Sequence, residues 1–196
     1  GSYMPCFLSG VAAAEAFAVG ADAPLYRVSH QQGHIMAAYA TSGALRDGVC
    51  EKHGGFIAFH ISGGTTECLL VRPSGVNFDV QLIGETADIN AGQAIDRIGV
   101  MLGLSFPCGP ALEALAIQNK EALPAIKTTV REGRCNLSGL ENNAKRLLDT
   151  GASQNLIAAY VFEFVSRTLV EMARYAREKH GGMPIVWAGG VMSNSI

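Results

Sequence analysis

Residues 55–66 read Gly-Phe-Ile-Ala-Phe-His-Ile-Ser-Gly-Gly-Thr-Thr, and this stretch with its continuation decides the fold class. Its first half is rich in β-branched and aromatic side chains, which favour a strand, and its glycine pair marks a turn. Two more strands are expected over residues 67–72 and 78–83, with a turn at Pro73-Ser74-Gly75 between them. A helix is expected next, over residues 90–102. This order predicts an α/β domain that opens with three strands and a helix.

The chain on both sides of this stretch is expected to be mainly helical. Before it, a small-residue helix over residues 10–19 precedes an extended piece over residues 25–28, and a second helix begins at His30 and stops near Gly43. After it, three helices and one short apolar strand are expected. They cover residues 111–119, 139–148, 153–180 and 184–188.

The composition excludes several classes of protein. In 196 residues, 48% are hydrophobic and only 16% are charged, with a net charge of −2, so the chain is globular and lacks the basic footprint of an autonomous nucleic-acid binder. Its 5 cysteines are scattered and odd in number, which predicts reduced thiols in a cytoplasmic protein. No apolar run approaches the ~20 residues of a membrane span, so no membrane association is expected.

Two histidines, His30 and His34, lie four residues apart in the second expected helix. This spacing puts two imidazoles on the same face of one helical turn. Because neutral imidazole is the commonest metal ligand, the pair can supply half of a metal site. The alternative is that one or both histidines cap or pack a buried helix start, and the pair alone leaves both interpretations open.

The turn between the first two strands contains Ser62, Gly63, Gly64, Thr65 and Thr66. A turn of glycines and hydroxyls can expose consecutive backbone N–H groups that cradle a phosphate or a carboxylate. The alternative is a simple tight hairpin, since Gly-Gly is also a favoured hairpin dipeptide.

Carboxylates near the expected helices are candidates for binding ribose hydroxyls. Asp96 lies in the helix after the third strand, where the alternative is that Asp88 caps this helix and Asp96 lies on its solvated face. Gly109 ends a rigid turn, and Glu113 follows it one helical turn later, so one ligand hydroxyl could meet both.

The last candidate loop is Ala188-Gly189-Gly190-Val191-Met192-Ser193-Asn194, which follows a buried strand. A glycine pair lets a flat ring approach the backbone, and the amide of Asn194 can bind a base or another polar group. A strand that runs into such a turn is a common place for backbone amides to meet a ligand.

The order of these motifs resembles one enzyme family throughout the chain. They are His-x-x-Gly-His, Ser-Gly-Gly-x-Thr, Gly-Glu-Thr-x-Asp with Ala-Ile-Asp, Pro-x-Gly-Pro-x-x-Glu, Leu-Ser-Gly-Leu and Gly-Gly-Val-x-x-Asn. The family is TsaD/Gcp, the tRNA threonylcarbamoyladenosine synthases, formerly described as O-sialoglycoprotein endopeptidases.

The resemblance implies an actin-like ATPase fold of two ribonuclease-H-like subdomains with a nucleotide between them. It implies one divalent metal ion, iron or zinc, and the transfer of a threonylcarbamoyl group from threonylcarbamoyl-adenylate to an adenosine of tRNA. His30 and His34 match the metal ligands. The residues that match nucleotide-binding positions are Ser62, Gly63, Gly64, Thr65, Thr66, Asp96, Gly109, Glu113, Gly189, Gly190 and Asn194.

The departures from the family pattern predict a diverged paralogue. Thr65 stands where the family usually has His or Asn, Cys108 replaces a glycine, and Ile89 replaces an aspartate. The chain is expected to be truncated at both ends, with the third metal ligand beyond Ile196. Residues 1–50 would end the first subdomain, and residues 51–196 would form the second with its helical insertion.

Two alternatives to the transferase are a catalytically degenerate nucleotide-binding scaffold and a metalloendopeptidase. Gln31 argues against a metalloendopeptidase. A zincin helix carries a glutamate directly after its first histidine as general base, and this chain has a glutamine there. An adenine nucleotide is the expected ligand. Binding of tRNA would require partner proteins, and a homo- or heterodimer is possible.

Overall fold

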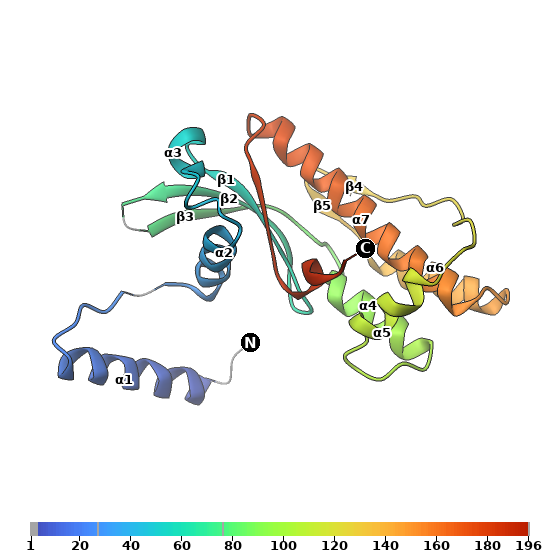
Figure 1. The fold of residues 1–196 in the computed structure, drawn as a ribbon, viewed down its shortest axis with the longest axis horizontal. Helices are drawn as coiled ribbons and strands as arrows, with labels where there is room; N and C mark the ends of the chain where they lie inside the picture. The colour runs from blue at the N-terminus through green and yellow to red at the C-terminus, as the bar shows by residue number, and fades with distance from the viewer. Residues whose placement is uncertain (1–3, 27, 76, 196) are drawn as a thin grey trace. The chain divides into compact units, whose positions relative to one another are not determined.

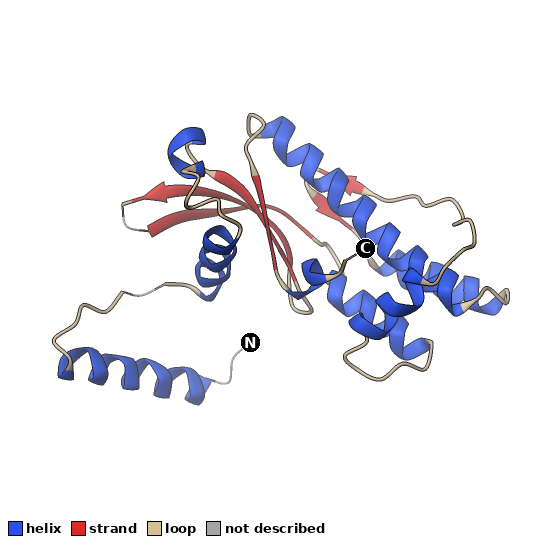
Figure 2. Cartoon of the chain, in the orientation of Figure 1, coloured by secondary structure: helices blue, strands red, loops and turns tan. Residues whose placement is uncertain are grey.

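The computed structural model describes residues 4–26, 28–75 and 77–195 and has an α/β fold, as predicted (Figures 1 and 2). By contacts the chain divides into two compact units, Gly1–Gly33 and His34–Ile196. This boundary lies inside a helix, and the subdomain division expected after residue 50 stays a prediction. Residues 34–50 belong to the larger unit because Ile35, Tyr39 and Cys50 are buried against its sheet.

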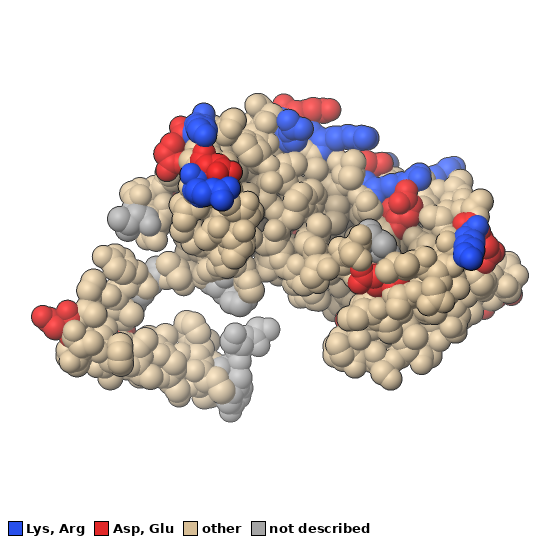
Figure 3. All heavy atoms as spheres, viewed as in Figure 1, with Lys and Arg blue, Asp and Glu red and all other residues tan. Residues whose placement is uncertain are grey.

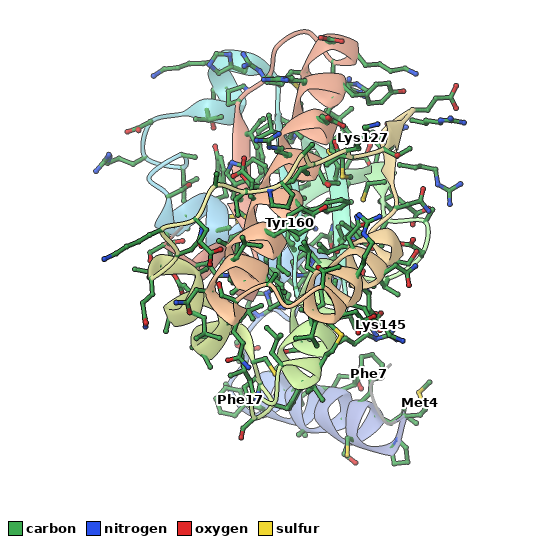
Figure 4. All side chains as sticks on the ribbon, turned by 90° about the vertical axis from the view of Figure 1, so that its right-hand side faces the viewer. Met4, Phe7, Phe17, Lys127, Lys145 and Tyr160 are labelled. Carbon is green, nitrogen blue, oxygen red and sulfur yellow. The ribbon has the colours of Figure 1, made fainter. Side chains whose placement is uncertain are left out.

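The smaller unit contains α1 (Met4–Gly20), a longer helix than the one expected. Its apolar side chains include Met4, Phe7 and Phe17, which are 62%, 58% and 77% exposed and extend away from the ribbon in Figure 4. None of its residues is buried. The extended piece expected after it forms no strand at the described residues 25, 26 and 28.

The larger unit is built on a four-stranded sheet in the order β3-β2-β1-β6. Its antiparallel part consists of β1 (Phe56–Ile61), β2 (Thr66–Ser74) and β3 (Asn77–Glu85), and β6 (Ile185–Ala188) pairs with β1 in parallel. All four strands were predicted within a few residues. The parallel partner places the end of β6 beside the end of β1, where two of the candidate loops begin.

One face of the sheet carries the larger core. It is covered by α4 (Ala91–Met101), α5 (Gly109–Ile117), α6 (Ser138–Asp149) and α7 (Gln154–Lys179). The apolar side chains of α7 recur at helical spacing, and Ser153 Oγ caps the helix by accepting the N–H of Leu156 at 3.1 Å. Figure 1 shows α7 running along this side of the molecule.

The opposite face carries a smaller core beneath α2 (His30–Thr41) and α3 (Val49–His53). Alternation along β1 divides its side chains between the two cores: Phe56 and Ala58 face α2, whereas Ile57, Phe59 and Ile61 face the helices of the larger core. The two sides of the sheet therefore hold separate clusters.

Four short elements were not predicted, because two to five residues give no usable period. They are α3, the hairpin of β4 (Val130–Arg131) with β5 (Arg134–Cys135), and the 3-10 turn η1 (Gly190–Ser193). The last of these lies within a candidate binding loop.

The surface features agree with the composition. Within the described ranges no helix is both long and apolar enough to cross a membrane. All 5 cysteines are free thiols, and only Cys6 is exposed. On the face drawn in Figure 3, basic and acidic side chains are interspersed rather than gathered into one basic surface.

Candidate functional site

Six of the predicted nucleotide-binding residues line a single cavity of about 300 Å³ in the larger unit. They come from four segments that are distant in sequence: the 62–66 loop, α4, the first half of α5 and the segment after β6. These residues are Gly63, Asp96, Gly109, Glu113, Gly190 and Asn194. A concave site with a few convergent polar groups is the usual form of a small-molecule pocket.

Asp96 joins α4 to the turn before α5. Its Oδ1 accepts the backbone N–H of Cys108 at 2.8 Å, and the side chain is half-buried at the cavity rather than on a solvated face. Its neighbour Arg97 does lie at the surface, 3.4 Å from Glu141. Asp96 therefore holds Cys108, the residue directly before Gly109, and still has a second oxygen that can accept a ligand hydroxyl.

Cys108, which replaces a glycine of the family pattern, fits because of a glycine on α4. A Cβ built on Gly99 would collide with Cβ of Cys108 and lie 2.7 Å from its Sγ, so the thiol occupies the space a side chain at position 99 would need. Burial raises the pKa of the Cys108 thiol, and the nearby Asp96 adds to this shift. Cys108 is thus a packing residue here.

Glu113 links α5 to the segment after η1. Its Oε1 accepts both the backbone N–H and the hydroxyl of Ser195, the latter at 2.7 Å. These hydrogen bonds lower the pKa of Glu113, so the carboxylate is ionised at neutral pH. The contact closes one side of the cavity, next to Asn194.

In the 62–66 loop, most hydrogen-bond donors bind acceptors within the loop itself. Ser62 Oγ accepts the N–H groups of Gly64 and Thr65, each at 3.1 Å, and lies 2.8 Å from Thr65 Oγ1. Only Gly63 of this loop lines the 300 Å³ cavity. The loop is therefore a tight hairpin turn stabilised by hydrogen bonds among its own residues, as in the simpler interpretation. It also exposes one glycine, Gly63, to the cavity.

Two helix–loop contacts fix this turn. The buried Thr66 hydroxyl accepts the N–H of Ala91 at 2.8 Å, and Ser62 carbonyl oxygen accepts the N–H of Gly92 at 3.2 Å. A Cβ at position 92 would lie 2.7 Å from the nitrogen of Gly63, so only glycine permits this approach. The start of α4 and the 62–66 loop form one rigid unit.

The loop after β6 is held in a similar way. Gly189 has φ 102°, and a Cβ there would collide with the carbonyl oxygen of Ile61, so a side chain is excluded at this position. Asn194 Nδ2 donates to the carbonyl oxygen of Val191 at 2.7 Å, which leaves the amide oxygen able to accept a hydrogen bond from a ligand.

Asp88 does not cap the helix that follows it, and this alternative interpretation was wrong. Asn90 is the N-cap of α4, in a capping box with Gln93. Asp88 instead accepts the N–H of Leu137 at 2.8 Å and both the N–H and the hydroxyl of Ser138, at 3.0 and 2.6 Å, at the start of α6. It joins the Gly-Glu-Thr-x-Asp motif to the Leu-Ser-Gly-Leu motif.

His34 lies on α2 and is exposed, in a hollow of about 440 Å³ that Gly189 and Ser193 also line. Ser193 lines the 300 Å³ cavity as well, so the two spaces are neighbours. The side chain of His30, the other predicted metal ligand, lies outside what the structure describes. Among the described side chains, no group of three His, Cys, Asp or Glu residues is arranged to hold a metal ion.

His60 is a neighbour of this hollow that sequence reasoning did not assign to the site. It is 4% exposed on β1, its ring stacks on that of His34 with centroids 4.8 Å apart, and its Nδ1 lies 3.3 Å from Thr65 Oγ1. The only available signal was a histidine in an otherwise apolar strand, which is more often a core residue.

Comparison with known proteins gives the same family along the whole chain. The profile described as "TsaD: tRNA N6-adenosine threonylcarbamoyltransferase" matches residues 1–196. Curated relatives of that name from Streptococcus gordonii and Streptococcus sanguinis are 31% and 30% identical, over 95% of this chain and 55% of theirs. The chain thus spans about half the length of these relatives. With the motifs in one cavity and the profile matched throughout, the chain belongs to the TsaD family.

Proposed function

We propose that the protein takes part in threonylcarbamoyl transfer to a tRNA adenosine and that the 300 Å³ cavity holds the adenylate part of the substrate. The observation that carries this proposal is the convergence of Gly63, Asp96, Gly109, Glu113, Gly190 and Asn194 on one cavity. The family membership supports the reaction class. Because the chain spans 55% of the relatives' length, the complete activity is a proposal as well.

The cavity residues suit a nucleoside monophosphate. Asp96 and Glu113 each keep one carboxylate oxygen for a ribose hydroxyl, since the other oxygen is bound to Cys108 or to Ser195. The amide oxygen of Asn194 can accept a hydrogen bond from an exocyclic amine of the base. Gly63 and Gly190 allow the ligand to approach the backbone closely.

In the reaction, the adenosine amine of tRNA attacks the carbamoyl carbon of the mixed anhydride and a new C–N bond forms. The anhydride C–O bond breaks, AMP leaves with its oxygen, and the proton lost by the amine passes to solvent water. The chain's contribution is positioning: the rigid unit of the 62–66 loop and α4 fixes the adenylate so that the carbamoyl group has one orientation. No side-chain nucleophile is needed.

We propose that His30 and His34 belong to a site for one divalent metal ion, iron or zinc. The exposed position of His34 in an open hollow beside the cavity fits this, because an ion could reach its imidazole from solvent. Such an ion would act as a Lewis acid on a carbamoyl or phosphate oxygen.

The remaining parts of the proposal concern the whole protein. The sheet order β3-β2-β1-β6 and its helices fit a ribonuclease-H-like subdomain of an actin-like fold. We propose that the protein meets tRNA in the cytoplasm together with partner proteins, as a homo- or heterodimer. The face drawn in Figure 3 has no single basic surface that would bind tRNA without a partner. 

Calorimetric titration with AMP, ADP and ATP tests the cavity. We expect binding of AMP to the unmodified protein and about 10-fold weaker binding to Asp96→Asn, because one charge-assisted hydrogen bond is lost while the bond to Cys108 can persist. Asp149→Asn, an exposed carboxylate at the end of α6, is the matched control and should bind AMP normally.

The competing proposal is a nucleotide-binding scaffold without turnover. It is favoured by the 62–66 loop, because the backbone N–H groups of Gly64 and Thr65 donate to Ser62 Oγ and are not open to a phosphate. Heat from AMP without any transfer to tRNA in the presence of the complete protein would favour the scaffold. No heat with any of the three nucleotides would exclude both forms of the proposal.

A further inference from the structure

A contact between Glu113 and Ser195 joins two of the segments that line the 300 Å³ cavity, α5 and the segment after β6. Glu113 lies in the first half of α5, and Ser195 directly follows Asn194. Glu113 Oε1 accepts the backbone N–H of Ser195 and also its hydroxyl, whose oxygen lies 2.7 Å away. Both donors of one exposed serine are therefore bound to a single carboxylate oxygen.

The turn that precedes Ser195 has hydrogen bonds of its own. Ser193 Oγ donates to the carbonyl oxygen of Gly190 at 2.6 Å, and Asn194 Nδ2 donates to that of Val191 at 2.7 Å. Both bonds lie within η1 and its C-cap, so they do not depend on α5. The contact with Glu113 is therefore expected to act on the carboxylate rather than on the turn.

The carboxylate of Glu113 has a strong reason to be held in this way. A glutamate side chain has several rotatable bonds, so an exposed one samples many rotamers. Among the described residues, Glu113 has no hydrogen-bond partner besides Ser195, and its second oxygen, Oε2, remains available to the cavity. A group that is already oriented loses less conformational entropy when a ligand binds to it.

We propose that Ser195 is a positioning residue, whose hydroxyl orients the Glu113 carboxylate toward a ribose hydroxyl of the adenylate. The inference rests on the proposed adenylate cavity and adds to it a residue outside the Gly-Gly-Val-x-x-Asn motif. Ser195 is not among the described residues that line the cavity, so it acts through Glu113. Its effect should therefore depend on the ribose hydroxyl that Glu113 binds.

Calorimetric titration of the full chain with AMP, 2′-deoxy-AMP and 3′-deoxy-AMP tests this dependence. We expect AMP to bind Ser195→Ala about 5-fold more weakly than the unmodified protein, because one hydrogen bond to the carboxylate is lost. The analogue that keeps the hydroxyl bound by Glu113 should lose the same factor. The analogue that lacks this hydroxyl should lose less than about 2-fold, since the two changes then remove one shared interaction.

Two further variants control this experiment. Ser195→Thr keeps a hydroxyl at the same position and should restore the affinity for AMP. Ser9→Ala removes another exposed hydroxyl, which donates to the carbonyl oxygen of Pro5 in α1, and should bind all three nucleotides as the unmodified protein does.

The other outcomes separate this inference from the proposed function. An equal loss for all three nucleotides in Ser195→Ala would mean a general structural role and would overturn the inference, while the adenylate cavity would stand. An unchanged affinity for AMP would overturn it as well. If the unmodified protein binds none of the three nucleotides, the proposed cavity and this inference both fail.

A second measurement tests the contact without any ligand. Carbon-13 NMR of labelled glutamate follows the titration of the Glu113 carboxyl group, whose pKa is lowered first by the hydroxyl and then by the backbone N–H of Ser195. We expect this pKa to rise in Ser195→Ala and to return in Ser195→Thr. The same pKa in all three proteins would overturn the inference, because the hydroxyl would then not hold the carboxylate.

Discussion

The two faces of the sheet differ in the size of the hydrophobic core that supports the candidate site on each face. The face under α4–α7 packs against a large cluster of buried residues, and the proposed adenylate cavity lies on that side. The face under α2 and α3 packs only a small cluster around Tyr39 and Phe56, and the histidine pair lies at its end. The cavity is therefore built on a rigid base, whereas the position of His34 depends on a few contacts of one helix.

This difference affects how each site can fail. A change in the larger core should destabilise the whole unit, because its helices share one cluster. A change in the smaller core should release α2 and α3 while the sheet and the cavity persist. Metal binding is then expected to be more sensitive to mutation of the α2 face than nucleotide binding is.

The largest effect is expected for Phe59→Ala. Phe59 is fully buried in the larger core and stacks on Trp187 with ring centroids 4.4 Å apart. We expect the free energy of unfolding to fall by about 4 kcal/mol, since the surrounding helices cannot move in to fill the space left by the phenyl ring. Urea denaturation of the variant measures this value.

Phe56→Ala, three positions earlier on the same strand, is the matched comparison. Phe56 is equally buried but faces α2, where it stacks on Tyr39 with centroids 4.8 Å apart. We expect a loss of about 3 kcal/mol, because α2 can move to fill part of the space. A larger loss than for Phe59→Ala would show that the smaller cluster is the more rigid of the two.

A loss of about 2 kcal/mol is expected for Asp88→Ala. The variant leaves the buried N–H of Leu137 and the N–H of Ser138 without the carboxylate that accepts them. The estimate is modest because Asp88 itself is exposed. Asp79→Ala, an exposed carboxylate on β3, should leave the free energy of unfolding unchanged within experimental error.

The contribution of Asp88 should depend on pH. Although the Asp88 residue is largely exposed, partial desolvation of its carboxyl group would by itself raise the pKa; the hydrogen bonds from Ser138, Leu137 and Ile89 outweigh this and hold the pKa below its ordinary value. The stability that the carboxylate provides is therefore complete above about pH 4 and is lost as the pH falls through the lower pKa of the folded state. The stability difference between the unmodified protein and Asp88→Asn should shrink below pH 4; a constant difference would contradict this.

The main elements could be predicted from the sequence because their signals are local. Strands β1–β3 and β6 and helices α4–α7 each show a period or a flanking turn residue, so only their ends were misplaced. The hairpin β4–β5 could not be predicted, since two residues per strand carry no pattern. The burial of Ile35 and Tyr39 against the sheet could not be predicted, because it is a tertiary contact.

The candidate site also has features that could be predicted from the sequence and features that could not. The glycines and carboxylates of the cavity could be named because they lie in motifs, although their meeting in one cavity came only from the fold. The partners of Asp88 lie about 50 positions away, at Leu137 and Ser138, and a lone His60 in an apolar strand gives no sign that it will meet His34. Contacts at that separation have no trace in a single sequence.

The smallest effect separates local from global stability on the α2 face. Tyr39 Oη accepts the buried N–H of Cys50 at 3.1 Å and so fastens α2 to α3. Tyr39→Phe keeps the ring stacked on Phe56 but leaves that N–H without an acceptor, which should cost about 1 kcal/mol. Hydrogen exchange should show faster exchange at Cys50 and in the second half of α2, with β1 and α7 unchanged. Equal acceleration in all four segments would mean that the two cores unfold together. The α2 face that carries His34 would then be as stable as the face that carries the cavity.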